Sequence, residues 1–295
     1  MSDLCRLNCK ACCQKNNIFI DLVDRIVRRP SLQFPGQWGY QCYEPRVYRT
    51  LAKILRHVDL DGFDILISDY ITFVKRSEYR LEKHFNHEFT EICVNTILYW
   101  VFARKGNSKF VELLLQKTRD YIQDRSCSLA LIWRTFTPVY CPSPLSGITP
   151  LLYVAQTRQS SILKILLQYG ILEMEKKPIN IVFTILFYPS RVRIMDDHEL
   201  IDIHEDAKRC LQLCTRVLSS IPVTEIKTQQ TFGRHPIISD WLDYIPSTRD
   251  KEPCELLHLC RLAIRNQLLT KTQLPSGIVF LPIPIILQHY LNLET

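Results

Sequence analysis

The sequence is poor in glycine, and the spacing of its glycines excludes several nucleotide-binding motifs. Only eight glycines occur in 295 residues, and no two of them form a G-x-G pair. The dinucleotide-binding fingerprint, the kinase glycine loop and the Walker A loop all depend on closely spaced glycines. None of these three motifs is therefore present.

The chain also lacks a long apolar run. Its longest uncharged apolar stretch lies between Lys177 and Arg191 and contains Pro178 and Pro189. A membrane-spanning helix needs roughly 18 or more apolar residues, so none is predicted. The N-terminus carries Asp3 and scattered cysteines where a signal peptide would carry its apolar core. We expect an intracellular protein, in the cytoplasm first, with the nucleus left open.

The twelve cysteines do not form a disulfide framework. Most lie singly in apolar stretches, as Cys93 and Cys214 do, which is typical of reduced cysteines acting as small hydrophobic residues. The exception is a polar tail over residues 1–16 with a cluster of four: Cys5, Cys9, Cys12 and Cys13. Zinc binding is the alternative for this cluster, but no second Cys/His pair follows at a zinc-finger distance, which favours an inert tail.

Catalytic motifs are missing as well. The stretch from His198 to Asp202 is one residue away from H-E-x-x-H, because Asp202 stands where the second histidine belongs. No G-x-S-x-G motif occurs. We interpret the acidic stretch as a solvated loop and helix start, and we expect no metal, no cofactor and no catalytic activity.

Positive charge is concentrated near the N-terminus. The net charge is +7, and residues 1–60 hold ten Lys or Arg against five Asp or Glu, whereas the last 45 residues hold four against three. A solvated, soluble surface is enough to explain this excess of positive charge, without any binding partner. Nucleic-acid binding is the alternative, but it usually brings a stronger basic patch than a sequence pI of about 8.8 indicates. We expect neither nucleic acid nor membrane as a partner.

Residues 147–171 have the pattern of a helix–turn–helix repeat. Pro150 suits the first turn of one helix, a run of Ile and Leu over 162–167 forms the second, and Gly170 is placed to end it. The T-P-L start, Ala155 and the I-x-x-L-L-x-x-G end resemble an ankyrin repeat, except that Arg158 stands where a central glycine is usual. Residues 102–115 align without gaps to residues 154–167, and Gly106 fills the slot of Arg158.

Further repeats are expected, because two repeats cannot bury a solenoid core. Residues 50–73 have two helical patterns around Asp61-Gly62, and residues 205–221 have apolar residues at helical spacing. The offset of 52 residues between the two good copies implies an insertion over 119–146. We expect an N-terminal tail and aromatic lead-in over 1–48 and a degenerate ankyrin-like region over 49–230, with its best repeats at 95–118 and 146–176.

The C-terminal residues form two further apolar segments. A helix is predicted over 253–268, with Pro253 in its first turn and His258, Arg261 and Arg265 on one narrow face. The rest of the helix is apolar, so it is either buried on both sides or has one face that awaits a partner. In residues 280–291, two prolines argue against a central strand and favour an extended turn that leads into a short helix.

These two segments resemble a SOCS box. Its first part, L-x-x-x-C-x-x-x-aliphatic, is met by Leu256, Cys260 and Ile264, and the fuller form also by His258, Leu259, Arg261 and Arg265. Its second part, L-P-x-P followed by L-x-x-Y-L, is met by Leu281, Pro282, Pro284, Leu287, Tyr290 and Leu291. One departure is Glu255, where a small residue usually precedes the leucine. The box region is expected over 232–295, with its core at 253–295.

Repeats followed by such a box resemble the ankyrin repeat and SOCS box family. The resemblance implies an all-α fold, in which a short degenerate ankyrin-type solenoid precedes a three-helix SOCS box. It also implies a non-catalytic substrate-recognition subunit of a ubiquitin ligase complex that directs a target protein to the proteasome. The alternative is a scaffold that binds elongins without directing degradation.

The resemblance also implies partners and site residues. Elongin C, which brings elongin B, would bind Leu256, Leu259, Cys260 and Ile264. Cullin-5 with its RING protein would bind the segment Leu281, Pro282, Ile283 and Pro284. The repeats would hold a substrate protein that the sequence does not identify.

Overall fold

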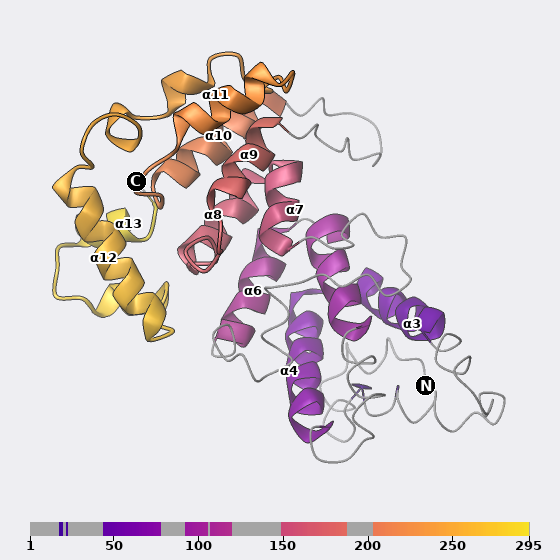
Figure 1. Ribbon diagram of the computed structural model, residues 1–295. Coiled ribbons are helices and arrows are strands. Elements are labelled where there is room, and N and C mark those ends of the chain that lie inside the picture. The colour runs from indigo at the N-terminus through magenta and orange to yellow at the C-terminus, as the bar shows by residue number, and fades with distance from the viewer. Residues whose placement is uncertain are drawn as a thin grey trace. The chain divides into compact units, whose positions relative to one another are not determined.

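The structure is a computed structural model, and it describes residues 18–19, 22, 44–77, 92–105, 107–119, 149–187 and 203–294. Every regular element within these ranges is helical, as predicted. The chain divides into two compact units, Met1–Pro150 and Leu151–Thr295 (Figure 1). The cysteine-rich tail, most of the aromatic lead-in, most of the predicted insertion after residue 119 and the His198–Asp202 motif lie outside the described residues.

The first unit contains the helices α3 (Glu44–His57) and α4 (Leu60–Ser77), as the two helical patterns of residues 50–73 predicted. The break between them was predicted at Asp61-Gly62 but lies earlier, at residues 58–59. The Asp59 carboxylate accepts a hydrogen bond from the Gly62 backbone N–H at 2.8 Å. Asp59 therefore caps α4, and Asp61-Gly62 belongs to the first turn of that helix.

The core of the first unit is aromatic. Residues 92–99 are helical and continue into η3 (Trp100–Lys105), and α6 (Ser108–Thr118) packs on both α4 and η3. The Phe110 ring centre lies 5.2 Å from both the Phe63 and the Trp100 ring centres, so one aromatic side chain joins three helical segments.

The second unit begins with the predicted helix–turn–helix, formed by α7 (Pro150–Thr157) and α8 (Ser160–Gln168). Arg158, which occupies the slot of the usual glycine, has a φ of 51° in the left-handed region. Its buried guanidinium donates to the backbone oxygens of Ile185, at 3.1 Å, and Gln156, at 3.3 Å. Burial lowers the Arg158 pKa to about 10, so the side chain stays charged at neutral pH.

The end of α8 confirms the prediction for Gly170. Its φ of 77° is left-handed, and its N–H donates to the Leu167 carbonyl at 3.0 Å. The next N–H, from Ile171, donates to the Leu166 carbonyl at 3.1 Å. These two bonds form a Schellman motif, in which glycine avoids the steric cost of the left-handed backbone.

The helices α9 (Ile179–Phe187) and α10 (Ile203–Thr215) follow, then α11 (Val223–Thr231), η6 (Trp241–Tyr244) and η7 (Ser247–Arg249). The helix α10 packs on α8, α9 and η6 and so lies at the centre of the unit (Figure 1). Its predicted apolar stripe is fully buried: Ala207, Cys210, Leu211 and Cys214. The helix stops at Thr215, and the buried side chains of Val217 and Ile221 come from the segment after it.

The last elements are α12 (Leu256–Thr270), η8 (Ser276–Phe280) and α13 (Ile285–Leu291). They enclose a small apolar cluster of Leu268, Leu274, Ile278 and Leu291. Among the helices that the structure describes, none combines the length and apolar character needed to cross a membrane.

Candidate functional site

The helix α12 buries its basic side chains and exposes the leucines near its start. His258, Arg261 and Arg265 are 2%, 4% and 0% exposed, whereas Leu256 is 77% exposed. A surface helix usually does the opposite, with apolar residues inward and charges outward. We call His258, Arg261 and Arg265 the docked face, and Leu256, Leu259 and Cys260, which are all exposed, the outward face.

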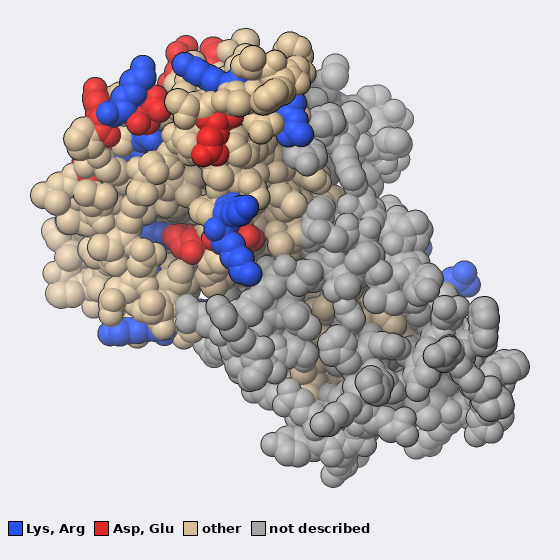
Figure 2. Space-filling view, viewed as in Figure 1, with Lys and Arg blue, Asp and Glu red and all other residues tan. Residues whose placement is uncertain are grey.

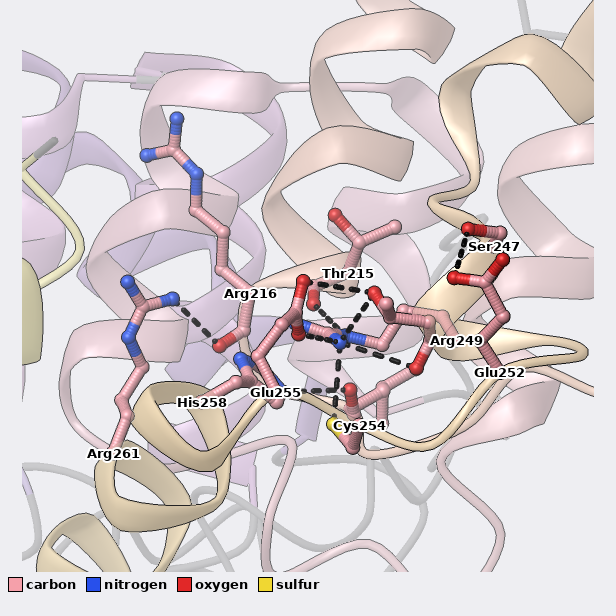
Figure 3. Close-up of polar contacts among 11 residues, drawn as sticks. Thr215, Arg216, Ser247, Arg249, Glu252, Cys254, Glu255, His258 and Arg261 are labelled. Atoms are coloured by element: carbon pink, nitrogen blue, oxygen red, sulfur yellow. Dashed lines mark hydrogen bonds and ion pairs between the residues drawn. The ribbon is translucent and has the colours of Figure 1, made fainter.

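An ion pair fixes the N-terminus of α12. The helix begins at Leu256 with Glu255 as its N-cap, so the prediction that Pro253 lies in its first turn is wrong. The Glu255 carboxylate accepts from Arg249 at 2.6 Å and from the Thr248 hydroxyl at 2.9 Å (Figure 3). These hydrogen bonds, Arg249 first, lower the pKa of Glu255 to about 2. The ion pair turns this residue toward η7, and the helix starts only after it.

His258 and Arg261 of the docked face, together with Arg249 of η7, contact main-chain carbonyls at and just after the C-terminal end of α10. Nε of Arg249 donates to the Thr215 oxygen at 3.1 Å, and Nη1 of Arg261 donates to the Arg216 oxygen at 3.1 Å (Figure 3). Nε2 of His258 lies 3.1 Å from the Leu218 oxygen. The last carbonyls of a helix have no partner within it and carry a partial negative charge. Cationic and N–H-bearing side chains therefore stabilise this end.

Arg261 also lies over an aromatic ring. Its guanidinium carbon is 3.3 Å from the centre of the Tyr290 ring in α13, which joins the first and last helices of this region. Burial is the main cause that lowers the Arg261 pKa to about 10. That value is still well above neutral pH, so the side chain remains a cation in its buried position.

Arg265 contacts three separate segments. Its Nε and Nη2 donate to one Glu173 carboxylate oxygen at 2.9 and 2.7 Å. Its Nη1 donates to the Leu291 oxygen at 3.1 Å, and Nη2 also donates to the Leu167 oxygen. A buried charge is tolerated only when it is paired and hydrogen-bonded, and here a carboxylate and two carbonyls meet that need.

The L-P-x-P segment alternates between inward and outward residues. Leu281 and Ile283 are half-buried and pack against the apolar cluster of this region, whereas Pro282 and Pro284 are exposed. Nε2 of Gln288 donates to the Leu281 and Ile283 oxygens at 3.2 and 3.3 Å. The segment is therefore held in a fixed extended shape that leads into α13, as predicted.

The predicted partner-binding residues occupy different environments. Leu256, Leu259 and Cys260 are exposed together on α12, while Ile264 is half-buried at the edge of the apolar cluster. Two further apolar residues are strongly exposed just before the proline segment, namely Val279 at 63% and Phe280 at 84%. Figure 2 shows few charges over the part of the surface that α12 and α13 occupy in Figure 1.

Sequence reasoning assigned no role to Val279 and Phe280. The signal that could have found them is the apolar run from Ile278 to Ile283, which is too long for a turn whose residues all face solvent. Val279 and Phe280 are exposed because they lie at the end of the helix η8, whose Ile278 is buried, and this placement depends on the fold.

The structure describes no cluster of metal-ligating side chains, and three of the five cysteines in its described ranges are buried. No group of three or more His, Cys, Asp or Glu side chains there could hold a metal ion. The five cysteines in the described ranges, Cys93, Cys210, Cys214, Cys254 and Cys260, are unpaired. Burial raises the pKa of the Cys93, Cys210 and Cys214 thiols, which makes them poor nucleophiles.

Comparison with known proteins identifies the region formed by α12, η8 and α13. The family model of the SOCS box matches residues 252–292, which include all of α12, η8 and α13. Across the whole chain, the "Ankyrin repeat and SOCS box protein 17" of Canis lupus familiaris is 76% identical over 294 residues, which cover 100% of this chain and 99% of the relative. The chain belongs to the ankyrin repeat and SOCS box family.

Two further relatives of that family carry the same name. The Homo sapiens protein is 74% identical over 294 residues and the Mus musculus protein 75%, each covering all of this chain and at least 99% of the relative. No solved structure matches the chain. The docked face and the outward face described above both lie on the first helix of the SOCS box.

Proposed function

We propose that this protein is a non-catalytic substrate-recognition subunit of an elongin–cullin–SOCS-box ubiquitin ligase. Membership in the ankyrin repeat and SOCS box family supports an adaptor role in a cullin–RING ligase. The observation that carries the proposal is the outward face of α12, where Leu256, Leu259 and Cys260 are exposed on a helix that is otherwise firmly docked.

Elongin C, together with elongin B, binds this outward face. Positions 256, 260 and 264 repeat every four residues and line one side of a helix, which is the pattern of a helix laid into an apolar groove. Fully burying a leucine side chain contributes about 1.5–3 kcal/mol. Leu256 and Leu259 supply most of the apolar area for this contact, and Ile264 forms its boundary with the core of the box.

Cullin-5 with its RING protein binds the segment Leu281–Pro284. Pro282 and Pro284 present the outward surface there, while Leu281 and Ile283 hold the segment against the box. The repeats carry a substrate protein, which is ubiquitinated and degraded by the proteasome. The chain contributes proximity, because holding a substrate lysine near the loaded conjugating enzyme raises its effective concentration.

Coexpression with tagged elongins B and C tests the proposal. The double variant Leu256→Ala, Cys260→Ala should lose elongin binding by on the order of a hundredfold, since buried interface anchors typically contribute 2 kcal/mol or more. Its unfolding midpoint should stay unchanged, because both side chains are exposed in the free chain. Leu242→Ala, at an exposed leucine on η6, is the matched control. Undiminished elongin capture by the double variant would overturn the assignment.

Affinity purification after proteasome inhibition tests the ligase role itself. Cullin-5 should copurify, and a partner held by the repeats should live longer when this protein is depleted. Elongin binding without cullin-5, or without any effect on a partner's lifetime, would instead mean a scaffold that does not direct degradation.

A further inference from the structure

The SOCS box is joined to the preceding repeat through the ends of helices. Arg265 reaches the Leu167 oxygen in the last turn of α8, Glu173 in the turn that follows, and the Leu291 oxygen at the end of α13. One fully buried side chain thus joins three segments that are 98, 92 and 26 residues away from it in sequence, in that order.

We call the contacts of Arg265 with the end of α8, the turn at Glu173 and the end of α13 the junction. Two neighbouring hydrogen bonds support it. Nε2 of Gln168 donates to the Asn292 oxygen at 2.9 Å, and Nη1 of Arg216 donates to the Leu293 oxygen at 3.3 Å. Leu293 itself is fully buried although its φ of 61° is left-handed, a strained conformation that persists only where packing imposes it. The residues after α13 are therefore fixed against α8 and α10.

We propose that Arg265 is a positioning residue, which fixes the outward face of α12 in one orientation relative to the repeat helices α8 and α10. The inference rests on the proposed function, because orientation matters only if the outward face carries the ligase. With this junction formed, the SOCS box and the last repeat move as one body. A substrate on the repeats is then held at a constant distance from the ubiquitin-loaded enzyme, which favours transfer to a defined set of lysines.

The chemistry of the junction requires an arginine. Its planar guanidinium presents five N–H donors in a rigid fork, so it can satisfy a carboxylate and two carbonyls together. A lysine carries the same charge but cannot span these three acceptors from one position. Methionine has similar length and none of the donors, and it would leave Glu173, which is 8% exposed, without its cation.

Hydrogen exchange on the full-length chain tests the junction directly. In Arg265→Met, amides at the end of α8, in the turn at Glu173 and at the end of α13 should exchange on the order of a hundredfold faster, while α7 and α9 keep their protection. Arg209→Met is the matched control, since Arg209 is an exposed arginine on α10 whose ion pair lies at the surface. Should the methionine variant fail to fold, Arg265→Lys provides the same comparison with a milder change.

The ligase readout separates positioning from mere stability. Elongin binding by Arg265→Lys should remain within about twofold of the wild type, because the outward face is untouched. In the assembled ligase, the set of this chain's own lysines that the conjugating enzyme ubiquitinates, mapped by peptide mass spectrometry, should become broader. Unchanged exchange at the junction, a uniform loss of protection over 151–294, or an unchanged lysine set would overturn the proposal. If no form of the chain binds elongins, the proposed function fails, while the exchange data still decide whether Arg265 forms the junction.

Discussion

Arg261 in α12 stacks on Tyr290 in α13, with its guanidinium carbon 3.3 Å from the ring centre, while its Nη1 donates to the Arg216 oxygen. One cation thus connects the first helix of the SOCS box, the last helix of the box and the C-terminal end of α10. The aromatic face partly replaces the water that a buried guanidinium loses, and such contacts contribute about 2 kcal/mol when desolvated.

Tyr290→Leu should therefore destabilise the protein by about 1–2 kcal/mol, while Tyr290→Phe, which keeps the aromatic face, should stay within about 0.5 kcal/mol of the wild type. Urea unfolding of both variants measures this difference. Tyr244→Leu is the control, since the half-buried Lys208 lies over that ring at the longer distance of 5.1 Å, so less stability should be lost. Equal losses in Tyr290→Phe and Tyr290→Leu would mean that the hydroxyl, not the cation–π contact, matters.

Gly170 and Gly233 form a natural pair for a second prediction. Both have a left-handed φ, of 77° and 81°. An added Cβ at Gly170 would lie 2.8 Å from a Leu269 methyl in the SOCS box, whereas at Gly233 it would meet nothing within 4 Å. Gly233→Ala should cost only the backbone strain of about 1–2 kcal/mol.

Gly170→Ala should cost that strain plus the displacement of Leu269, about 1–3 kcal/mol more. The difference between the two unfolding free energies measures how tightly the end of α8 packs on the SOCS box. If the two variants lost the same stability, the contact between Gly170 and Leu269 would carry no energy.

The lowered pKa of His258 predicts that the stability of the folded chain depends on pH. Burial, followed by the charge of Arg249, lowers its pKa below the usual 6.5, with Arg261 adding to the lowering and Glu255 and the Leu218 carbonyl opposing it. Because a carbonyl can only accept, Nε2 carries the proton of the neutral ring and donates to Leu218. The unfolded chain thus takes up a proton before the folded chain does, so stability falls as the pH drops below about 6.5 and levels off below the folded-state pKa.

Unfolding midpoints of wild type and His258→Gln, measured from about pH 7.5 to 5.5, test this dependence. The variant keeps a side-chain N–H but cannot titrate, so its stability should fall less over this range. His235→Gln, at an exposed histidine, should follow the wild type. Parallel curves for wild type and His258→Gln would show that His258 does not titrate differently in the folded state.

Local patterns predicted the repeat and the box because their signals lie within a few residues. The proline start of α7, the glycine end of α8 and the two SOCS-box segments depend on short-range geometry and apolar spacing. The start of α12 was predicted too early because the residue that pairs with Glu255, Arg249, lies before the helix. A contact between two side chains leaves no pattern in the local sequence. The burial of Arg261 and Arg265 could not be predicted either, because their partners lie 26 to 98 residues away in sequence. These partners are backbone carbonyls and, for Arg265, also the Glu173 carboxylate.

The last prediction concerns the cullin segment, whose four residues differ in exposure. Pro282→Ala with Pro284→Ala should reduce cullin-5 recovery while elongin binding and the unfolding midpoint stay near wild type, because both prolines are exposed. The Pro284 carbonyl, which accepts from the Leu287 and Gln288 N–H groups at 2.9 and 3.1 Å, is retained in alanine. The helix α13 therefore still begins at the same place.

Leu281→Ala with Ile283→Ala is the matched comparison, since it alters the same segment from its inward side. Each side chain packs against the cluster of Leu268, Leu274, Ile278 and Leu291, so the double variant should lose about 2–4 kcal/mol of stability. This loss is at the low end of the range for truncating two buried side chains, because both sites are only half-buried. Recovery of elongins and cullin-5 should then fall together. Quantitative pull-down of both partners, alongside urea unfolding, separates the two variants. If the proline variant lost elongins and cullin-5 equally, residues 281–284 would support the box rather than form a separate binding surface.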